Sequence, residues 1–209
     1  DISADGLTYT FQIRKGIKWH DKAPMNGREL IAEDIVFNFH RITGTGSGYT
    51  EPTPLQKSLP ALAFESIEAP DDYTMVVKLE REHFGALSII TDDSFTFVYP
   101  PEVIKEHGDV TDWRNLVGTG PVELVDWTEG TSLKWAKNPS YWGYDEKYPK
   151  NRLPYVDEIE AIIITDPATR MSAMRTGKID SIMGGGCTVT LDDVSNLERT
   201  NPEIAAHQY

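Results

Sequence analysis

The chain of 209 residues has a single cysteine, Cys187, which excludes an intramolecular disulfide and a cysteine-rich metal site. One cysteine is compatible with a cytosolic protein and equally with an exported bacterial protein that needs no covalent staple. Long apolar runs are also lacking, because no stretch approaches the roughly 18 residues of a membrane-spanning helix. The longest apolar stretches, such as residues 161–164, have the length of a buried strand.

Basic residues are few, since 20 Lys and Arg stand against 33 Asp and Glu, and the formal net charge is −13. A field of this sign repels phosphate groups, so the charge excludes nucleic acid as a partner and argues against docking on anionic lipid. Solubility is the simplest role for the charge. The remaining composition, 39% hydrophobic and 25% charged residues, is that of a folded globular protein.

Catalytic motifs are lacking too. None of the five histidines has a second ligand at helical or hairpin spacing, so we expect no metal. The glycine-rich stretch 44–48 follows a predicted helix and is not followed by Lys-Ser/Thr, so it does not predict a phosphate loop, and we expect no cofactor. No G-x-S-x-G motif occurs, and the adjacent Asp92 and Asp93 would point to opposite faces of a strand. These absences favour a binding module over an enzyme.

The pattern that is present alternates between strands and helices. Strict alternation over 8–13 predicts a half-buried strand, and Asn26 with Glu29 resembles a capping box ahead of a helix. Asp166 before a proline, and Gly177, predict the start and end of another helix. The remaining predicted strands cover 17–19, 64–69, 73–79, 122–127, 133–137, 159–165 and 179–183, and the predicted helices cover 31–42, 84–90, 100–107, 167–176 and 190–201. Their irregular order indicates a mixed α/β fold rather than a doubly wound sheet.

Three pairs of segments carry a resemblance to a known family. They are 5–21 (DGLTYTFQIRKGIKWHD) with 32–41 (AEDIVFNFHR), 117–121 (VGTGP) with 138–143 (NPSYWG), and 166–170 (DPATR) with 175–180 (RTGKID). In this order and spacing they resemble the hallmarks of the family 5 extracellular solute-binding proteins, the oligopeptide, dipeptide and nickel receptors of ABC importers. The resemblance covers about residues 5–207. The stretch 25–30 lengthens the usual link before the first helix, and we expect it to alter only a surface loop.

The resemblance implies a mixed α/β fold of the type II periplasmic-binding-protein kind. Members of the family have two lobes hinged around a ligand, together with a smaller auxiliary domain. By this comparison residues 1–113 form the auxiliary domain, and residues 114–209 form the middle segment of the first lobe, ending near the hinge. The resemblance also implies that the opposite lobe is absent from this chain, which would then be a piece of a longer protein.

The implied function is the capture of a peptide or related small solute outside the membrane and its delivery to the permease subunits of an ABC importer. No reaction is implied for this chain. The resemblance further implies an extracytoplasmic location, in the periplasm or at the cell surface, with a lipid anchor and a monomeric state in the full-length form.

Family pockets imply three sources of ligand-facing residues in this sequence. The loop after the first helix points to Tyr49. The segment before the helix that starts at a proline adds Asp92, Asp93, Ser94 and Phe95. The glycine-rich loop after residues 179–183 adds Gly184, Gly185 and Cys187. Where some relatives carry a basic residue, this chain has two carboxylates, which disfavour an anionic or carboxylate-first ligand.

Two alternative functions stay open. One is an oligosaccharide receptor of the same family, in which tryptophans act as stacking platforms for sugar rings. The tryptophans are Trp19, Trp113, Trp127, Trp135 and Trp142. The other is a secreted hydrolase that uses Asp92 and Asp93 as a carboxylate pair.

Overall fold

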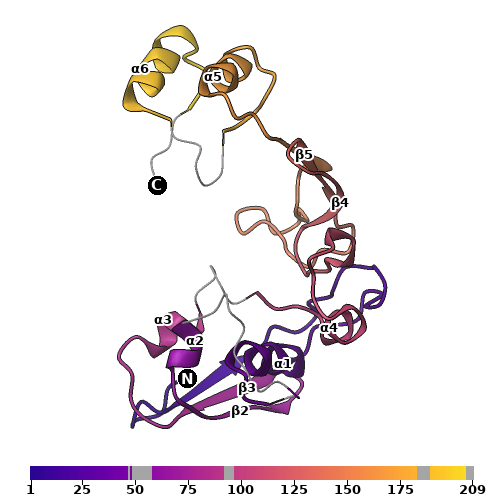
Figure 1. Cartoon of the computed structure of the whole chain (residues 1–209), viewed down its shortest axis with the longest axis vertical. Helices are drawn as coiled ribbons and strands as arrows, with labels where there is room; N and C mark the ends of the chain where they lie inside the picture. Colours follow the sequence, from indigo (N-terminus) through magenta and orange to yellow (C-terminus); the bar gives the residue numbers. More distant parts are fainter. Residues whose placement is uncertain (47, 49–57, 92–96, 183–188, 206–209) are drawn as a thin grey trace. The chain divides into compact units, whose positions relative to one another are not determined.

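A computed structural model describes residues 1–46, 48, 58–91, 97–182 and 189–205 (Figure 1). The chain divides into two compact units. The first contains residues 1–127 and 134–160, and the second contains residues 128–133 and 161–209. None of the described helices combines the length and the apolarity that a membrane crossing needs, and the longest, α1, has 12 residues.

The first unit contains an antiparallel sheet in the order β1 (Thr8–Gln12), β3 (Thr74–Leu79), β2 (Phe64–Asp71). Val77 in the central strand lies opposite both Tyr9 and Ile67. Residues opposite one another in neighbouring strands share a face of the sheet, and all three side chains are buried. The alternation in the sequence therefore predicts correctly which face of β1 enters the core.

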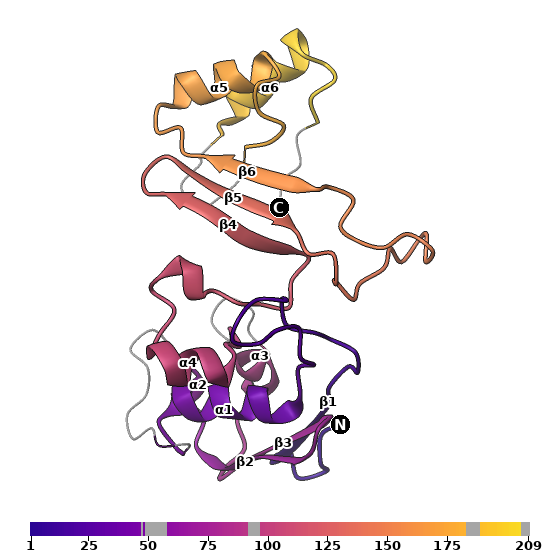
Figure 2. The ribbon, with the colours of Figure 1, turned by 90° about the vertical axis from the view of Figure 1, so that its right-hand side faces the viewer.

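Helix α1 (Ala32–Thr43) covers this sheet, as Figure 2 shows. Val36, Phe39 and Ile42 recur at helical spacing and are buried against the sheet in one apolar cluster. The short helices α2 (Ser58–Ala61) and α3 (Ala86–Ile90) complete the cluster.

The start of α1 differs from the sequence prediction. Asn26 lies in a turn with φ of 47°, and the Glu29 carboxylate accepts from the backbone N–H of Gly16, so the predicted capping pair is wrong. The helix begins at Ala32, and Asp34 in its first turn accepts from the N–H of Ile31 at 3.1 Å. The acidic side chain that accepts a hydrogen bond at the start of the helix is therefore Asp34, three residues after the N-cap residue Ile31.

A second apolar cluster in the first unit contains Trp19, Met25, Leu30, Val103 and Val117. It packs the segment between β1 and α1 against α4 (Pro101–His107), a helix that starts at a proline and ends at His107, as predicted, with Gly108 as its C-cap. Residues 17–19 form a single bridge between Lys18 and Glu29 rather than a strand.

The expectation that 25–30 alters only a surface loop is wrong. Met25 and Leu30 expose 3% and 7% of their surface and belong to this second cluster. Long-range packing against α4, which spacing along the chain does not reveal, makes the stretch part of the core.

After the short 3-10 helix η1 (Trp113–Asn115), the chain forms a second sheet in the order β4 (Val122–Thr128), β5 (Ser132–Lys137), β6 (Glu158–Ile162) (Figure 2). The predicted hairpin is confirmed, with Gly130 at φ 69° in its turn. β6 is shorter than predicted, although the N–H of Ile163 still donates to Thr131 O at 2.8 Å. Several large apolar side chains of this sheet are exposed, among them Trp127 and Ile162.

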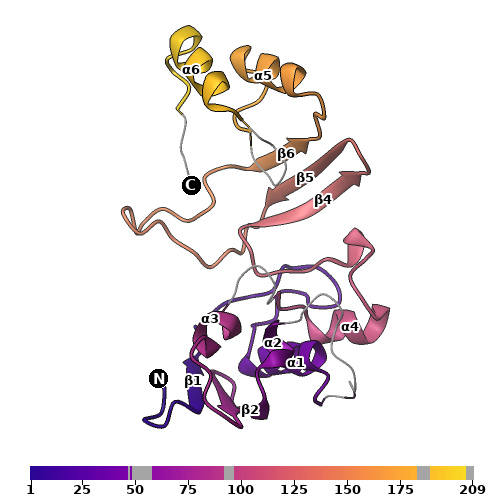
Figure 3. The ribbon, with the colours of Figure 1, turned by 60° about the vertical axis from the view of Figure 1, so that its left-hand side comes forward.

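The second unit contains helices α5 (Pro167–Arg175) and α6 (Leu191–Thr200), which lie side by side in Figure 3. Met171 and Leu197 are their buried apolar residues, and the Asn201 amide donates to Arg175 O at 3.3 Å. The strand predicted over 179–183 is wrong for residues 179–182, which have no strand conformation. A strand needs a neighbour for its hydrogen bonds, and the structure pairs none with these residues in the part of the unit that it describes.

The cap of α5 supports a stability prediction. The Asp166 carboxylate accepts from the backbone N–H of Thr169 at 2.7 Å. The Thr169 side chain, followed by this backbone N–H, lowers the pKa of Asp166. Replacing Asp166 with alanine is expected to lower the urea midpoint without changing the slope of the transition. Replacing it with asparagine, which keeps an acceptor, should preserve most of the midpoint. An unchanged midpoint for the alanine variant would show that the cap contributes nothing.

Candidate functional site

The eight ligand-facing residues implied by the resemblance lie outside the described residues. They are Tyr49, Asp92, Asp93, Ser94, Phe95, Gly184, Gly185 and Cys187. The structure describes the residues on either side of these three segments and shows how the chain is held where it enters and leaves them.

The chain leaves α1 in a fixed direction ahead of the first segment. Gly44 has φ of 69° and donates its N–H to His40 O at 2.9 Å, which closes the helix. Gly46 has φ of 147° and packs on the His40 ring, where a Cβ would come within 2.8 Å of Nδ1. Glycine is therefore required at this position, both by the backbone and by the close approach.

The chain that follows the second segment is held by Asn38, a fully buried residue of α1. Its side-chain oxygen accepts from the N–H of Tyr99 at 3.0 Å, and its Nδ2 donates to Tyr99 O at 2.7 Å. The same Nδ2 donates to Asp34 O at 2.8 Å. The carboxamide thus pairs with Tyr99 as a neighbouring strand would, and it fixes the backbone four residues after Phe95.

Arg28 anchors the start of α4. Its guanidinium donates two bonds to Asp34, at 2.7 and 2.8 Å, and two to Glu102, at 2.8 and 2.9 Å. Asp34 is buried and also accepts from Trp19 Nε1 at 3.2 Å. Hydrogen bonds to the carboxylates, led by that to Asp34, raise the pKa of Arg28, and the bond from Arg28 lowers the pKa of Glu102. Neither the neighbouring residues in the sequence nor their spacing predicts this network, because Arg28 and Glu102 are 74 positions apart.

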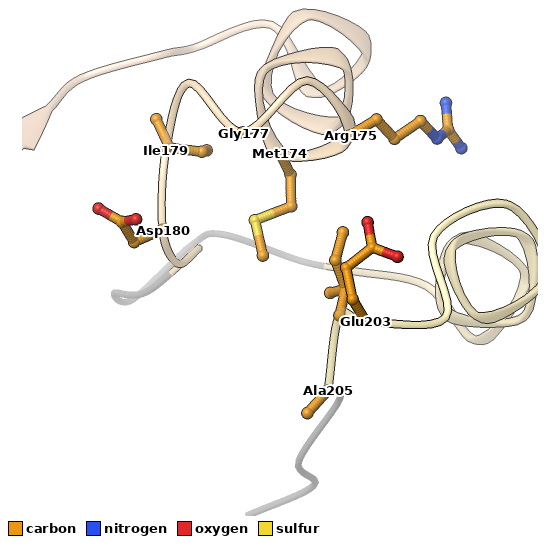
Figure 4. A pocket seen from close by; sticks show the side chains of 8 residues that line it. Met174, Arg175, Gly177, Ile179, Asp180, Glu203 and Ala205 are labelled. Atoms are coloured by element: carbon orange, nitrogen blue, oxygen red, sulfur yellow. The ribbon is translucent and has the colours of Figure 1, made fainter.

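A hollow of about 360 Å³ lies in the second unit between the end of α5 and the residues that follow α6 (Figure 4). Met174 and Glu203 converge on it, while Arg175 extends away from the centre of the view. It is lined by Met174, Arg175, Gly177, Ile179, Asp180, Glu203, Ile204 and Ala205. Its charges are of both signs, and Asp180 precedes the third predicted segment, at Gly184, by four positions.

Within the described residues, no three His, Cys, Asp or Glu side chains gather closely enough to hold a metal ion. A second hollow, of about 380 Å³, follows one side of α5 and is lined by small and polar residues such as Ala173 and Ser172.

Two of the tryptophans are poorly placed to stack on a sugar. Trp19 exposes 1% of its surface and is a core residue. One ring face of Trp142 is covered by the guanidinium of Arg14, 4.8 Å from the ring centre. Trp127 in β4 is 41% exposed.

Comparison with known sequences assigns the chain to a family. The model of the bacterial extracellular solute-binding proteins, family 5 (middle), matches residues 1–201. The chain belongs to this family. Family 5 proteins are receptors for solutes rather than enzymes, and the mixed α/β architecture is that of their type II periplasmic-binding-protein fold.

Two curated relatives illustrate the range of family 5. Heme-binding protein A of Haemophilus influenzae is 30% identical over 194 residues, which are 88% of this chain and 34% of that protein. The dipeptide-binding protein of Escherichia coli is 28% identical over 189 residues, 84% of this chain and 33% of that protein. The chain thus spans about a third of the length of these relatives.

Solved structures agree on the fold. The periplasmic binding protein DppA of Helicobacter pylori, in complex with the peptide STSA, superposes with a TM-score of 0.75 at 29% identity, covering 95% of this chain and 38% of that one. MoaA of Agrobacterium tumefaciens, in complex with mannopinic acid, gives 0.72 at 25% identity, covering 97% of this chain and 36% of that one. The mixed α/β fold expected from the sequence is confirmed.

Proposed function

We propose that this chain is part of an extracytoplasmic solute receptor that captures peptides or related small solutes and delivers them to the permease of an ABC importer. The observation that carries the proposal is the family 5 match over residues 1–201. The likeness to a peptide-bound DppA over 95% of the chain supports a peptide as ligand. One relative is named as a haem-binding protein, and another was solved in complex with mannopinic acid. Because these ligands differ from peptides, the ligand class is the first property to test.

The proposed ligand-facing residues are Tyr49, the segment 92–95, Gly184, Gly185 and Cys187. Two carboxylates, Asp92 and Asp93, would favour a cationic group of the ligand and disfavour an anionic one. The residues flanking the middle segment support a role in positioning, because Asn38 and Arg28 fix the chain that leads from it into α4. Glycines at 184 and 185 would allow a ligand to approach the backbone closely.

The arrangement of the whole protein follows from the same proposal. Residues 1–113 would form an auxiliary domain, and residues 114–209 would form part of the first of two lobes that enclose the ligand. A location in the periplasm or at the cell surface, a lipid anchor and a monomeric state are proposed with it. The partners would be the permease subunits in the membrane.

Calorimetry on the whole protein with a matched set of ligands tests this function. The set contains a tetrapeptide, its N-acetylated form, its C-terminal amide and an oligosaccharide of similar size. We expect the free tetrapeptide to bind, the amide to bind at least as well, and the acetylated form to bind more weakly, because acetylation removes the cation. Binding of the oligosaccharide but of no peptide would show that the ligand is a sugar. If no member of the set binds, the proposal of a peptide or sugar receptor is contradicted.

No turnover is expected from this protein, because family 5 consists of receptors and the sequence carries no recognised catalytic motif. The measurement is product release from peptide and chromogenic glycoside panels. The variants Asp92→Asn and Asp93→Asn serve as controls for a carboxylate-dependent hydrolase. Turnover that disappears in either variant would overturn the assignment as a receptor.

A further inference from the structure

His20 holds a distant part of the chain at a buried position in the first unit. It exposes 5% of its surface, and its backbone N–H donates to Gly118 O at 2.8 Å. Residues 117–121, here called the junction segment, lead from η1 into β4. The two partners are 98 positions apart in the sequence, so this contact joins the loop before α1 to the start of the second sheet.

Both ring nitrogens of His20 bind the junction segment. Nδ1 lies 3.2 Å from the backbone nitrogen of Gly118, and Nε2 lies 3.1 Å from Gly120 O. A backbone N–H can only donate and a carbonyl can only accept, so Nδ1 is unprotonated and Nε2 carries the hydrogen. The imidazole is therefore neutral in this arrangement. Gly120 O receives a second bond from Asn138 Nδ2 at 3.0 Å, which saturates it.

The surroundings disfavour a charged ring. Burial lowers the pKa of His20 below its usual 6.5, and the nearby charge of Lys22 acts in the same direction. Gly120 O and the carboxylate of Glu123 in β4 act in the opposite direction; each is a smaller effect than burial and a larger one than that of Lys22. Lys22 itself donates to Leu116 O at 3.3 Å, immediately before the junction segment, and the Asp21 carboxylate lies beside Gly27.

We propose that His20 is a pH-sensitive clasp that holds the junction segment only while its imidazole is neutral. A proton taken from solvent would occupy Nδ1 and face the N–H of Gly118, so that two donors would oppose each other at the site of the present bond. The bond is lost and a buried charge is created, and opening of the segment relieves both. The clasp connects residues on either side of the expected domain boundary at 113, and it acts whatever solute the protein binds.

The sign of the pH dependence follows from linkage. The closed form has the lower pKa, so the clasp contributes its full stability above pH of about 6.5 and loses it as the pH falls through the pKa of the closed form. Between these two values the opening equilibrium rises with acidification, at most about tenfold for each pH unit, and it becomes constant below the lower value.

Hydrogen exchange of the Gly118 amide between pH 7.5 and 4.5, corrected for the intrinsic pH dependence of exchange, tests the proposal on the chain itself. We expect opening to increase on acidification over part of this range, by up to about tenfold per pH unit. The variant His20→Gln can still accept from Gly118 and donate to Gly120, and it should show a flat profile. His83→Gln removes an exposed ring whose Nδ1 accepts from the Gly85 N–H at 3.2 Å, and it should keep the wild-type profile at Gly118.

Identical profiles for the wild type and His20→Gln would overturn the clasp. A titration of the His20 ring by NMR in the unaltered chain gives the second measurement, which does not depend on the folding of any variant. It should show the Nε2–H tautomer at neutral pH and a pKa below 6.5. A pKa at or above that value would overturn the proposal by itself.

Discussion

Replacing Arg28 with alanine is expected to lower the free energy of unfolding by about 3 kcal/mol, because it leaves the buried Asp34 carboxylate without its cation. Asp34 exposes 3% of its side chain and would retain only the bonds from Trp19 Nε1 and the N–H of Ile31. Glu102 would lose its partner too, and with it the link between α4 and the start of α1. Removing one member of a buried ion pair costs more than the pair itself contributes.

Urea denaturation at pH 7 measures this effect, and two variants serve as controls. Arg28→Lys keeps the charge but not the planar fork that serves two carboxylates, so it should recover only part of the loss. Arg114→Ala removes an arginine paired with Asp112 on the surface, and its midpoint should change little. Equal midpoints for Arg28→Ala and Arg114→Ala would contradict a structural role for the network.

The acid side of the stability profile gives a further check on the same network. The pKa of Glu102 lies below its usual 4.5 because Arg28 donates to it, so the pair contributes stability above that pH and loses it as the pH falls further. As the pH falls below 4.5, the free energy of unfolding should therefore decrease less for Arg28→Ala than for the unaltered chain.

The second large effect concerns solute binding by the 209-residue chain alone. The chain spans about a third of the length of its curated relatives, and we propose that it carries one side of a cleft between two lobes. A whole receptor with a Kd of about 1 µM binds with about −8 kcal/mol. If half of the contacts are missing, about −4 kcal/mol remains, which corresponds to a Kd of about 1 mM.

Calorimetry with the same tetrapeptide on the chain and on the whole protein measures this difference, which we expect to be near a thousandfold. The Asp166→Asn variant of the chain, which keeps a helix cap, should bind the tetrapeptide as the unaltered chain does. A comparable micromolar affinity of both proteins would contradict the placement of the site between two lobes and would locate it wholly within residues 1–209.

Several local signals in the sequence predict local structure correctly in this protein, although the capping pair of Asn26 and Glu29 is wrong. The alternation over 8–13 predicts β1 and its buried face, because side chains of a strand point alternately to two sides. The Asp166 and Gly177 signals predict the limits of α5, because caps depend on residues within one turn. The family resemblance predicts the mixed α/β fold of the type II kind, which the structural comparisons confirm.

Contacts across long sequence distances could not be predicted in the same way. The stretch 25–30 reads as a loop, yet Met25 and Leu30 are buried and Arg28 reaches Glu102, 74 positions away. The burial of His20 depends on the junction segment, and only the folded chain brings the two together. The predicted strand over 179–183 illustrates the reverse, since an apolar run has strand propensity but needs a hydrogen-bonding neighbour.

The candidate site could be anticipated only through the family, because neither Tyr49 nor the pair Asp92 and Asp93 has a spacing that by itself indicates a ligand. The eight proposed residues lie outside the part of the chain that the structure describes, and they stay a prediction. What the structure adds is the framework around them, in which Asn38 and the glycine at 46 fix the chain close to two of the three segments.

Native mass spectrometry of the whole protein, purified without denaturation, tests the central claim most directly. A receptor that encloses its solute retains it during purification, so the account predicts a bound species in the mass range of a peptide or other small solute. That species should leave on denaturation and be recovered on readdition, with one solute bound per protein. A protein that carries no solute, and that takes up none from a peptide and oligosaccharide mixture, would contradict the assignment as a solute receptor.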